Sequence, residues 1–85
     1  MPNPEIDLLV DFNSEDDTGL PWTLISEARD PSLIVPGRCV IAGAGSAVAV
    51  SRIVDVDENG VVHLFPIKGS VEDNRHLLDA QPSSA

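Results

Sequence analysis

The sequence predicts a mainly β fold: a small SH3-like antiparallel barrel, or a strongly curled sheet, with a short C-terminal helix. Three apolar runs rich in β-branched residues fall within residues 38–67, and an Asn-Gly pair at 59–60 separates two of them, which is a hairpin pattern. A helix-start pattern begins at Ser70. Because an open sheet in so short a chain would expose long strand edges, we expect the strands to close on themselves.

The 85 residues suit one small domain. We expect an acidic, partly ordered N-terminal segment over residues 1–18, a single β domain over 19–80 and a flexible tail over 81–85. A core of this size is thin, so pairing with a second copy of the chain would add buried apolar surface.

The first half of the chain holds short apolar runs whose structure the pattern leaves open. Residues 6–10 predict either an edge strand or a single helical turn. Residues 22–26 form a second run, and their alternation is too short to decide between strand and helix. Residues 27–30 favour a helical turn that ends before Pro31, because the residue before a proline avoids the α conformation. A Pro-Gly turn at 36–37 then leads into the sheet.

The central sheet is expected from residue 38 onward. Its predicted parts are a first strand at 38–42, a Gly-rich connection at 43–46, a long strand at 47–57 bent near Ser51 or Arg52, and a partner strand at 61–67. A C-terminal helix of about two to three turns follows. Ser70 is its candidate N-cap, with acidic residues in the first turn. The residues with helical spacing are Val71, Asn74, Leu77 and Leu78.

Two loop geometries can join the two long strands, and they give opposite pairings. A two-residue Asn59-Gly60 turn places Val56 opposite His63. A three-residue loop, with Gly60 in the left-handed conformation, places Val56 opposite Val62 and Val54 opposite Leu64. The three-residue loop is preferred because it separates the side chains better into two faces. One face then holds Val48, Val50, Val54, Val56, Val62 and Leu64, interrupted by Arg52, and the other holds Ala49, Ser51, Asp55, Asp57, Val61 and His63, with Ile53 and Phe65.

A Pro-Trp pair and a Glu-Ala-Arg-Asp-Pro run precede the strands, which carry Val-His-Leu and are followed by Val-Glu. This order resembles a group of small uncharacterised bacterial domains. The matching residues, within 19–74, are Pro21, Trp22, Glu27, Ala28, Arg29, Asp30, Pro31, Val62, His63, Leu64, Val71 and Glu72. Lys68 stands where that group has Pro. The resemblance implies a compact SH3-like bacterial domain with no known activity and no catalytic residues.

Charge excludes several partners. The chain has 14 acidic and 5 basic residues, a net charge of −9. This field repels phosphate backbones and anionic lipids, so neither nucleic acid nor a membrane surface is an expected partner. An aromatic content of 4% leaves few stacking platforms for single strands. A basic protein partner remains compatible with the charge, as does a role in solubility alone.

Cysteine usage and hydropathy indicate the compartment. The single cysteine, Cys39, excludes an internal disulfide framework and suits a reducing environment. No apolar run reaches the ~20 residues of a membrane span. The acidic N-terminus lacks the basic region of a signal peptide. We therefore expect a cytoplasmic protein.

Two acidic stretches match metal-binding loops only in part. Residues 55–60 fit the first half of the calcium-loop pattern, but the position that needs a bidentate Glu holds Pro66, and the flanks predict strands. Residues 11–17 gather oxygen ligands without the required Gly. An acidic hairpin tip and a solvated loop are the preferred interpretations, and neither a metal ion nor a cofactor is expected.

Candidate catalytic groups are few. Gly43-Ala44-Gly45 begins like a phosphate-binding loop, but a strand pattern follows where a phosphate site needs a helix. Cys39 is interpreted as a buried structural thiol, although the strand of His63 is near enough in the predicted sheet to leave their contact open. The sequence has no nucleophile elbow and no pair of carboxylates in apolar surroundings. The chain is predicted not to be an enzyme.

Four residues are candidate interaction residues: Trp22, Arg52, His63 and Phe65. Trp22 is expected to close one end of the barrel, or else to anchor a partner, because Trp is enriched at interface hot spots. Arg52 interrupts an apolar face, and it either pairs with an acid at the sheet edge or meets one across a subunit boundary. His63 is expected on a strand surface, and Phe65 on a face that is partly covered.

Contact with a protein partner, with self-association into a homodimer favoured by the thin core, is the predicted function. Two rival functions stay open. An acidic inhibitor or nucleic-acid mimic of a basic enzyme would need its acids clustered on one face. A small ligand-binding barrel would need a pocket that joins Cys39 and His63.

Overall fold

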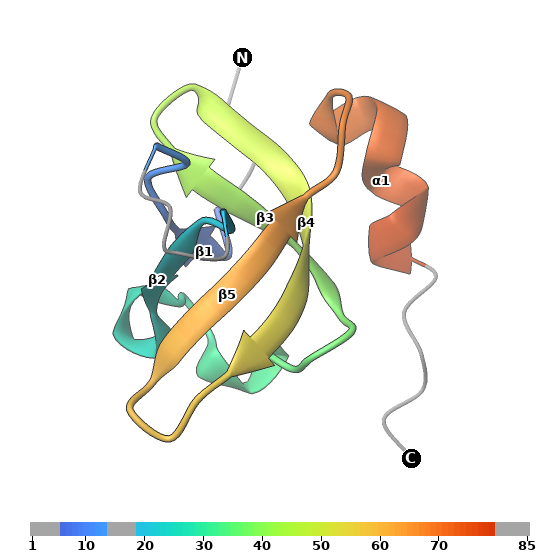
Figure 1. The fold of residues 1–85 in the computed structure, drawn as a ribbon. Helices are drawn as coiled ribbons and strands as arrows, with labels where there is room; N and C mark the ends of the chain where they lie inside the picture. Colours follow the sequence, from blue (N-terminus) through green and yellow to red (C-terminus); the bar gives the residue numbers. More distant parts are fainter. Residues whose placement is uncertain (1–5, 14–18, 80–85) are drawn as a thin grey trace.

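The computed structural model describes residues 6–13 and 19–79, and within them five strands form one sheet in the order β1-β3-β4-β5-β2. The elements are β1 (Leu8–Leu9), β2 (Trp22–Leu24), the 3₁₀ turns η1 (Ile25–Glu27) and η2 (Pro31–Leu33), β3 (Cys39–Ala44), β4 (Ala47–Val56), β5 (Val61–Pro66) and α1 (Val71–Asp79). The sheet curls until its two edge strands, β1 and β2, lie near each other (Figure 1). The predicted mainly β fold is confirmed: the sheet is nearly closed into a barrel, and one short helix follows it.

Three strand pairings are antiparallel, and β1 runs parallel to β3. The long connection between β1 and β3 makes the parallel pairing possible, because a parallel neighbour cannot be reached by a tight turn. Of the alternatives left open for residues 6–10, the edge strand is therefore correct. Residues 22–26 divide between the two alternatives, since β2 ends at Leu24 and η1 begins at Ile25.

The hairpin between β4 and β5 has the preferred three-residue loop. Gly60 has a φ of 81°, and Val56 lies opposite Val62. Asp57 holds the turn, because its Oδ1 accepts hydrogen bonds from the backbone N–H groups of Asn59 (2.8 Å) and Val61 (3.0 Å). The side chain of Asp57 thus fixes the geometry that the Asn-Gly pair predicts.

The expected pairing of Val54 with Leu64 is wrong. The register shifts between Ile53 and Asp55, and Ile53 lies opposite Leu64. Val54 is therefore the extra residue of a β-bulge, which reverses the facing of the residues before it. Consequently Ile53 points into the barrel. The irregularity in β4 falls at Val54, close to the bend expected near Ser51 or Arg52.

The hairpin between β3 and β4 is tighter than predicted. Ala44 pairs with Ala47, so β3 extends through two of the residues expected in the connection. Gly43 has a φ of 142°, and a Cβ atom at this position would collide with the carbonyl oxygen of Ala47. Glycine is needed here because the facing strand approaches so closely.

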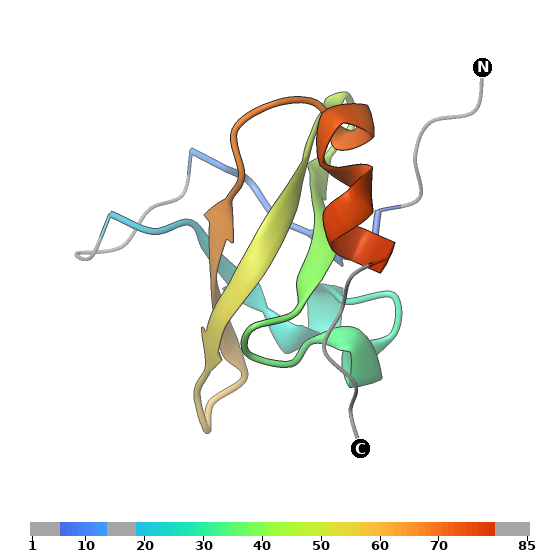
Figure 2. The ribbon, with the colours of Figure 1, turned by 90° about the vertical axis from the view of Figure 1, so that its right-hand side faces the viewer.

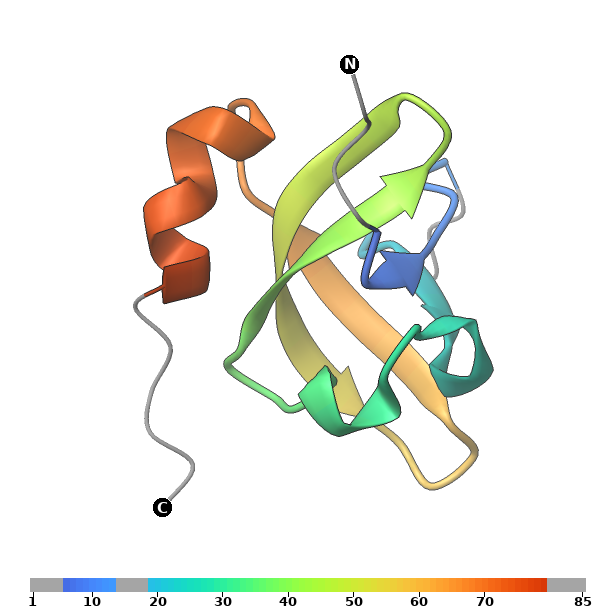
Figure 3. The same ribbon diagram turned by 180° about the vertical axis from the view of Figure 1, so that it is seen from behind.

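Two apolar clusters stabilise the fold on opposite sides of the sheet. The first fills the barrel and consists of Leu8, Val10, Ile34, Val40, Ala42, Ile53, Val62 and Leu64. The second lies between the outward side of the sheet and α1, and its buried members are Cys39, Ile41, Val50 and Val71. Figures 2 and 3 show α1 against the outside of β3 and β4, away from β2. Leu8 and Val10 belong to the predicted N-terminal segment, which thus contributes to the barrel interior.

Asp7 ties the start of β1 to two other parts of the barrel. Its Oδ1 accepts a hydrogen bond from Arg29 Nη2 at 2.7 Å, and its Oδ2 accepts one from the backbone N–H of Ile41 at 3.1 Å. Leu8 also forms an antiparallel bridge with Ala28. The predicted helical turn at 27–30 is wrong, because Ala28 is extended and takes part in this closure.

The C-terminal helix forms as predicted. Ser70 Oγ accepts a hydrogen bond from the N–H of Asp73 at 3.1 Å, which is the N-cap interaction. Val71 and Asn74 are buried against the sheet, while Leu77 and Leu78 are half-buried. Within residues 6–13 and 19–79, α1 and the two 3₁₀ turns are all too short or too polar to span a bilayer. The predicted tail at 81–85 lies outside the described residues.

Candidate interaction surface

The acidic hairpin tip uses its carboxylate for structure. Asp57 Oδ1 already accepts two backbone hydrogen bonds within the turn, and β-strands flank the loop. The part of the chain that the structure describes contains no cluster of three metal-ligating His, Cys, Asp or Glu residues. The second acidic stretch, residues 11–17, lies partly outside that region. Gly43-Ala44-Gly45 leads into strand β4, in agreement with its interpretation as a hairpin connection.

Cys39 and His63 lie on different strands with β4 between them. Cys39 is opposite Arg52, and Arg52 is opposite Phe65 on the far side of β4. Since neighbouring strands are about 4.8 Å apart, roughly 10 Å separates the backbones of β3 and β5. Cys39 is buried beneath α1, whereas the Nδ1 atom of His63 lies 2.7 Å from Asp55 Oδ1 on the exposed side. Among the described residues, the structure therefore does not bring Cys39 and His63 together.

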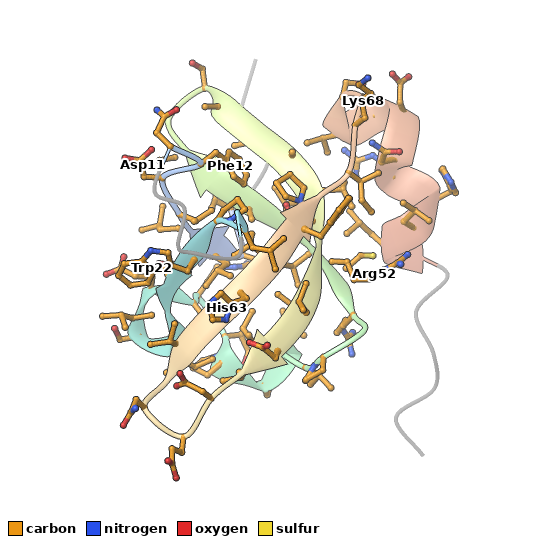
Figure 4. All side chains as sticks on the ribbon, viewed as in Figure 1. Asp11, Phe12, Trp22, Arg52, His63 and Lys68 are labelled. Carbon is orange, nitrogen blue, oxygen red and sulfur yellow. The ribbon has the colours of Figure 1, made fainter. Side chains whose placement is uncertain are left out.

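The four candidate interaction residues lie together on one outward surface. Cross-strand partners share a face of the sheet: His63 is opposite both Trp22 and Asp55, and Phe65 is opposite Arg52. We call the outward side of β2, β5 and the adjoining part of β4 the front sheet face; its members used below are Trp22, Arg52, Val54, Asp55, His63 and Phe65. Figure 4 shows Trp22, His63 and Arg52 across this face.

The front sheet face exposes large apolar side chains. The exposed fractions are 57% for Phe65, 41% for Val54 and 38% for Trp22. Trp22 lies on the outward side of the sheet, opposite His63, and does not fill the barrel interior. Arg52 is exposed, and it makes no hydrogen bond or ion pair within the described residues. The ion pair expected at the sheet edge is therefore not formed among the described residues.

The described acidic side chains are distributed over the molecule. They include Asp11 and Glu27 beside β1 and β2, Asp57 at the β4–β5 hairpin, and Glu72 and Asp73 at the start of α1. Several of them serve local structure. Hydrogen bonds from Ser32 hold the pKa of Asp30 below its usual value. A hydrogen bond from Arg75 lowers the pKa of Glu72 in the same way. Within residues 6–13 and 19–79, the carboxylates are therefore dispersed and do not gather on one face.

A second surface feature was missed by sequence reasoning. An open groove of about 420 Å³ lies beside the seam between β1 and β2, and its lining includes Leu9, Trp22, Leu24, Glu27 and Asp11. These residues come from separate parts of the chain. They meet only because the barrel closes, so no local pattern could have grouped them. The one signal available in the sequence was the apolar run at 6–10. In the structure, this run buries Leu8 and leaves Leu9 46% exposed.

Comparison with known proteins found no matching family model, no similar curated protein and no similar solved structure.

Proposed function

We propose that this protein acts through protein–protein contact and that the front sheet face pairs with the same face of a second copy. The observation that carries the proposal is the exposure of Phe65 and Val54 on a sheet surface whose neighbouring part is covered. Exposed apolar side chains that gather on one face are typical of interaction sites. The proposal assigns the chain no catalytic role, and it places the protein in the cytoplasm because the single cysteine suits a reducing compartment.

The charges on this face favour a second copy as the partner. Arg52 is an exposed cation beside Phe65, and Asp55 is an acid with a 59% exposed side chain in the next row of the sheet. A twofold axis near Phe65 would bring Arg52 of each copy toward Asp55 of the other. A twofold interface uses the same patch on both subunits, so it requires such self-complementary charges. They would also offset the repulsion between two chains that each carry a net charge of −9.

Light scattering on the protein across a wide concentration range tests the proposal. The mass is expected to rise from that of a monomer to that of a dimer. Phe65→Ser removes the central apolar contact and should keep the protein monomeric. Arg52→Glu should weaken the dimer, because it places like charges opposite each other, while Arg52→Lys should weaken it less.

Val35→Ser is the matched control. Val35 is 47% exposed, comparable to Phe65, but it follows η2 and lies off the front sheet face. Its substitution should leave the association constant unchanged. A wild-type protein that stays monomeric at every concentration would refute the proposal, and so would equal weakening by Val35→Ser and Phe65→Ser.

A further inference from the structure

We propose that the groove at the β1–β2 seam binds an extended segment of a partner protein in which apolar residues alternate with Lys or Arg. This groove is separate from the self-association contact, although Trp22 borders both. The proposal rests on the groove's shape, on the edge of β2 with which no other described strand pairs, and on the charge of the rim.

The shape of the groove favours side chains of an extended segment over an enclosed small molecule. Its volume of about 420 Å³ is bounded by the exposed apolar side chains of Leu9, Trp22 and Leu24. Ligand pockets of this volume, in the range of ~300–1,000 Å³, usually bury most of a small ligand. Here the wall residues themselves remain 38–46% exposed, so the groove is open along the seam and suits a chain that lies across it.

The edge of β2 offers backbone groups to such a segment. The Pro21 carbonyl accepts a hydrogen bond from the N–H of Leu64 in β5 (3.2 Å), and the Ile25 N–H donates to the carbonyl of Gly60, which directly precedes β5 (2.7 Å). Because the bonding direction alternates along an antiparallel strand, the N–H and C=O groups of Trp22 point away from β5, toward the seam. β1 does not pair with them, since the seam is joined at this level by the hydroxyl of Thr23, which donates to the Leu9 carbonyl at 2.8 Å. An added strand can therefore pair at Trp22.

The rim of the groove selects a basic segment. Asp11 and Glu27 are both exposed at the groove, and its described lining contains no basic residue. The net charge of −9 reinforces this local preference at longer range. Lys or Arg side chains on alternate positions would reach the two carboxylates while the apolar side chains between them contact Leu9 and Leu24.

Trp22 provides a direct readout, because it is the only tryptophan and the chain has no tyrosine. The probe is the synthetic peptide acetyl-Lys-Val-Lys-Leu-Lys-Val-Lys-amide, titrated into the Phe65→Ser variant so that self-association does not contribute. Burial of the indole should shift its emission to the blue in a saturable way. The matched peptide with Glu in place of every Lys should give no shift. A peptide with Pro in place of each Val should bind more weakly, because Pro cannot pair as a strand.

Substitutions locate the binding. Leu9→Ser should weaken binding about tenfold or more, through lost apolar contact. Glu27→Gln should weaken it about two- to fivefold, as expected for an exposed ion pair. Glu58→Gln makes the same charge change at the hairpin tip and should leave binding unaltered.

Several results would overturn the proposal. Equal weakening by Glu58→Gln and Glu27→Gln would mean that only the net charge attracts the peptide. Binding of the acidic peptide, or no emission shift with the basic one, would exclude a basic occupant. A shift of the Trp22 emission with rising concentration of the Phe65→Ser protein, in the absence of peptide, would show that a second copy fills the groove. None of these results depends on whether the front sheet face forms a dimer.

Discussion

The outward surface of the sheet has two adjoining parts with different surroundings. Under α1, Cys39, Ile41 and Val50 are at most 8% exposed. On the front sheet face, Phe65 and Trp22 are 57% and 38% exposed. The two parts are continuous, because Arg52 is opposite Cys39 on one side and Phe65 on the other. An apolar outward surface therefore does not itself indicate a binding site; what matters is whether the chain supplies its own cover.

The two parts also differ in composition. The covered part holds aliphatic side chains and a thiol, which pack against Val71 of α1. The front sheet face combines aromatic residues with Arg52 and a His63–Asp55 pair. Aromatic residues and Arg are enriched in protein interfaces. The first composition is that of an intramolecular core, and the second resembles the composition of protein interfaces.

The largest effect on stability is expected from shortening a side chain in the covered part. Val50 is fully buried, so Val50→Ala should lower the free energy of unfolding by about 2 kcal/mol, from lost transfer energy and a small cavity. Urea denaturation followed by Trp22 fluorescence measures this change. A loss below about 0.5 kcal/mol would mean that α1 does not pack closely on β4.

A smaller loss is expected where α1 joins the sheet. Asn74 is 8% exposed, and its Nδ2 donates to the carbonyl oxygens of Lys68 (2.9 Å) and Ser70 (3.3 Å). Asn74→Ala should cost about 1–2 kcal/mol, because it removes the hydrogen bond from the buried Asn74 side chain to the Lys68 carbonyl. In the Asn74→Ala variant, amide hydrogen exchange should accelerate more in α1 than in the barrel strands. Uniformly faster exchange would show that the two parts unfold together.

On the front sheet face, substitution should hardly change the stability of the monomer. Phe65→Ser is expected to alter the free energy of unfolding of the dilute protein by about 0.5 kcal/mol or less, although it should abolish the proposed self-association. Urea denaturation of the dilute protein measures this free energy, and Val50→Ala serves as the comparison. If Phe65→Ser were as damaging as Val50→Ala, Phe65 would belong to the core, and the distinction between the two parts would be lost.

The smallest expected effect concerns pH. The Arg75 hydrogen bond lowers the pKa of Glu72 in the folded protein from its ordinary value of 4.5. The stabilisation is therefore present above pH 4.5 and is lost as the pH falls through the lower, folded-state pKa. Acid titration followed by circular dichroism should show this loss in the helix, and Glu72→Gln should remove it. An unchanged titration in Glu72→Gln would assign the effect to another carboxyl group.

Local signals allowed much of the fold to be predicted. Gly60 and Asp57 determine the three-residue loop, and Ser70 caps α1, so each feature depends on neighbours in the sequence. β1 and β2 could not be assigned in the same way. They are only two and three residues long, and they are held by pairings with residues more than 30 positions away. Strands this short carry no readable alternation.

The four candidate interaction residues could be proposed from the sequence, but their arrangement could not. The register expected from the loop placed Arg52 and Phe65 on opposite faces of the sheet. The bulge at Val54 shifts β4 by one residue and brings Arg52 opposite Phe65. No residue type near Val54 requires a bulge, so the front sheet face could not have been assembled from the sequence.

A dilution series followed by amide NMR tests the central claim most directly, because it reports both whether copies associate and where they touch. As the concentration rises, signals from Arg52, Val54 and Phe65 should shift together along one binding curve, while those of α1 and of the covered residues stay fixed. Spectra that do not change with concentration, or shifts confined to α1, would contradict the account.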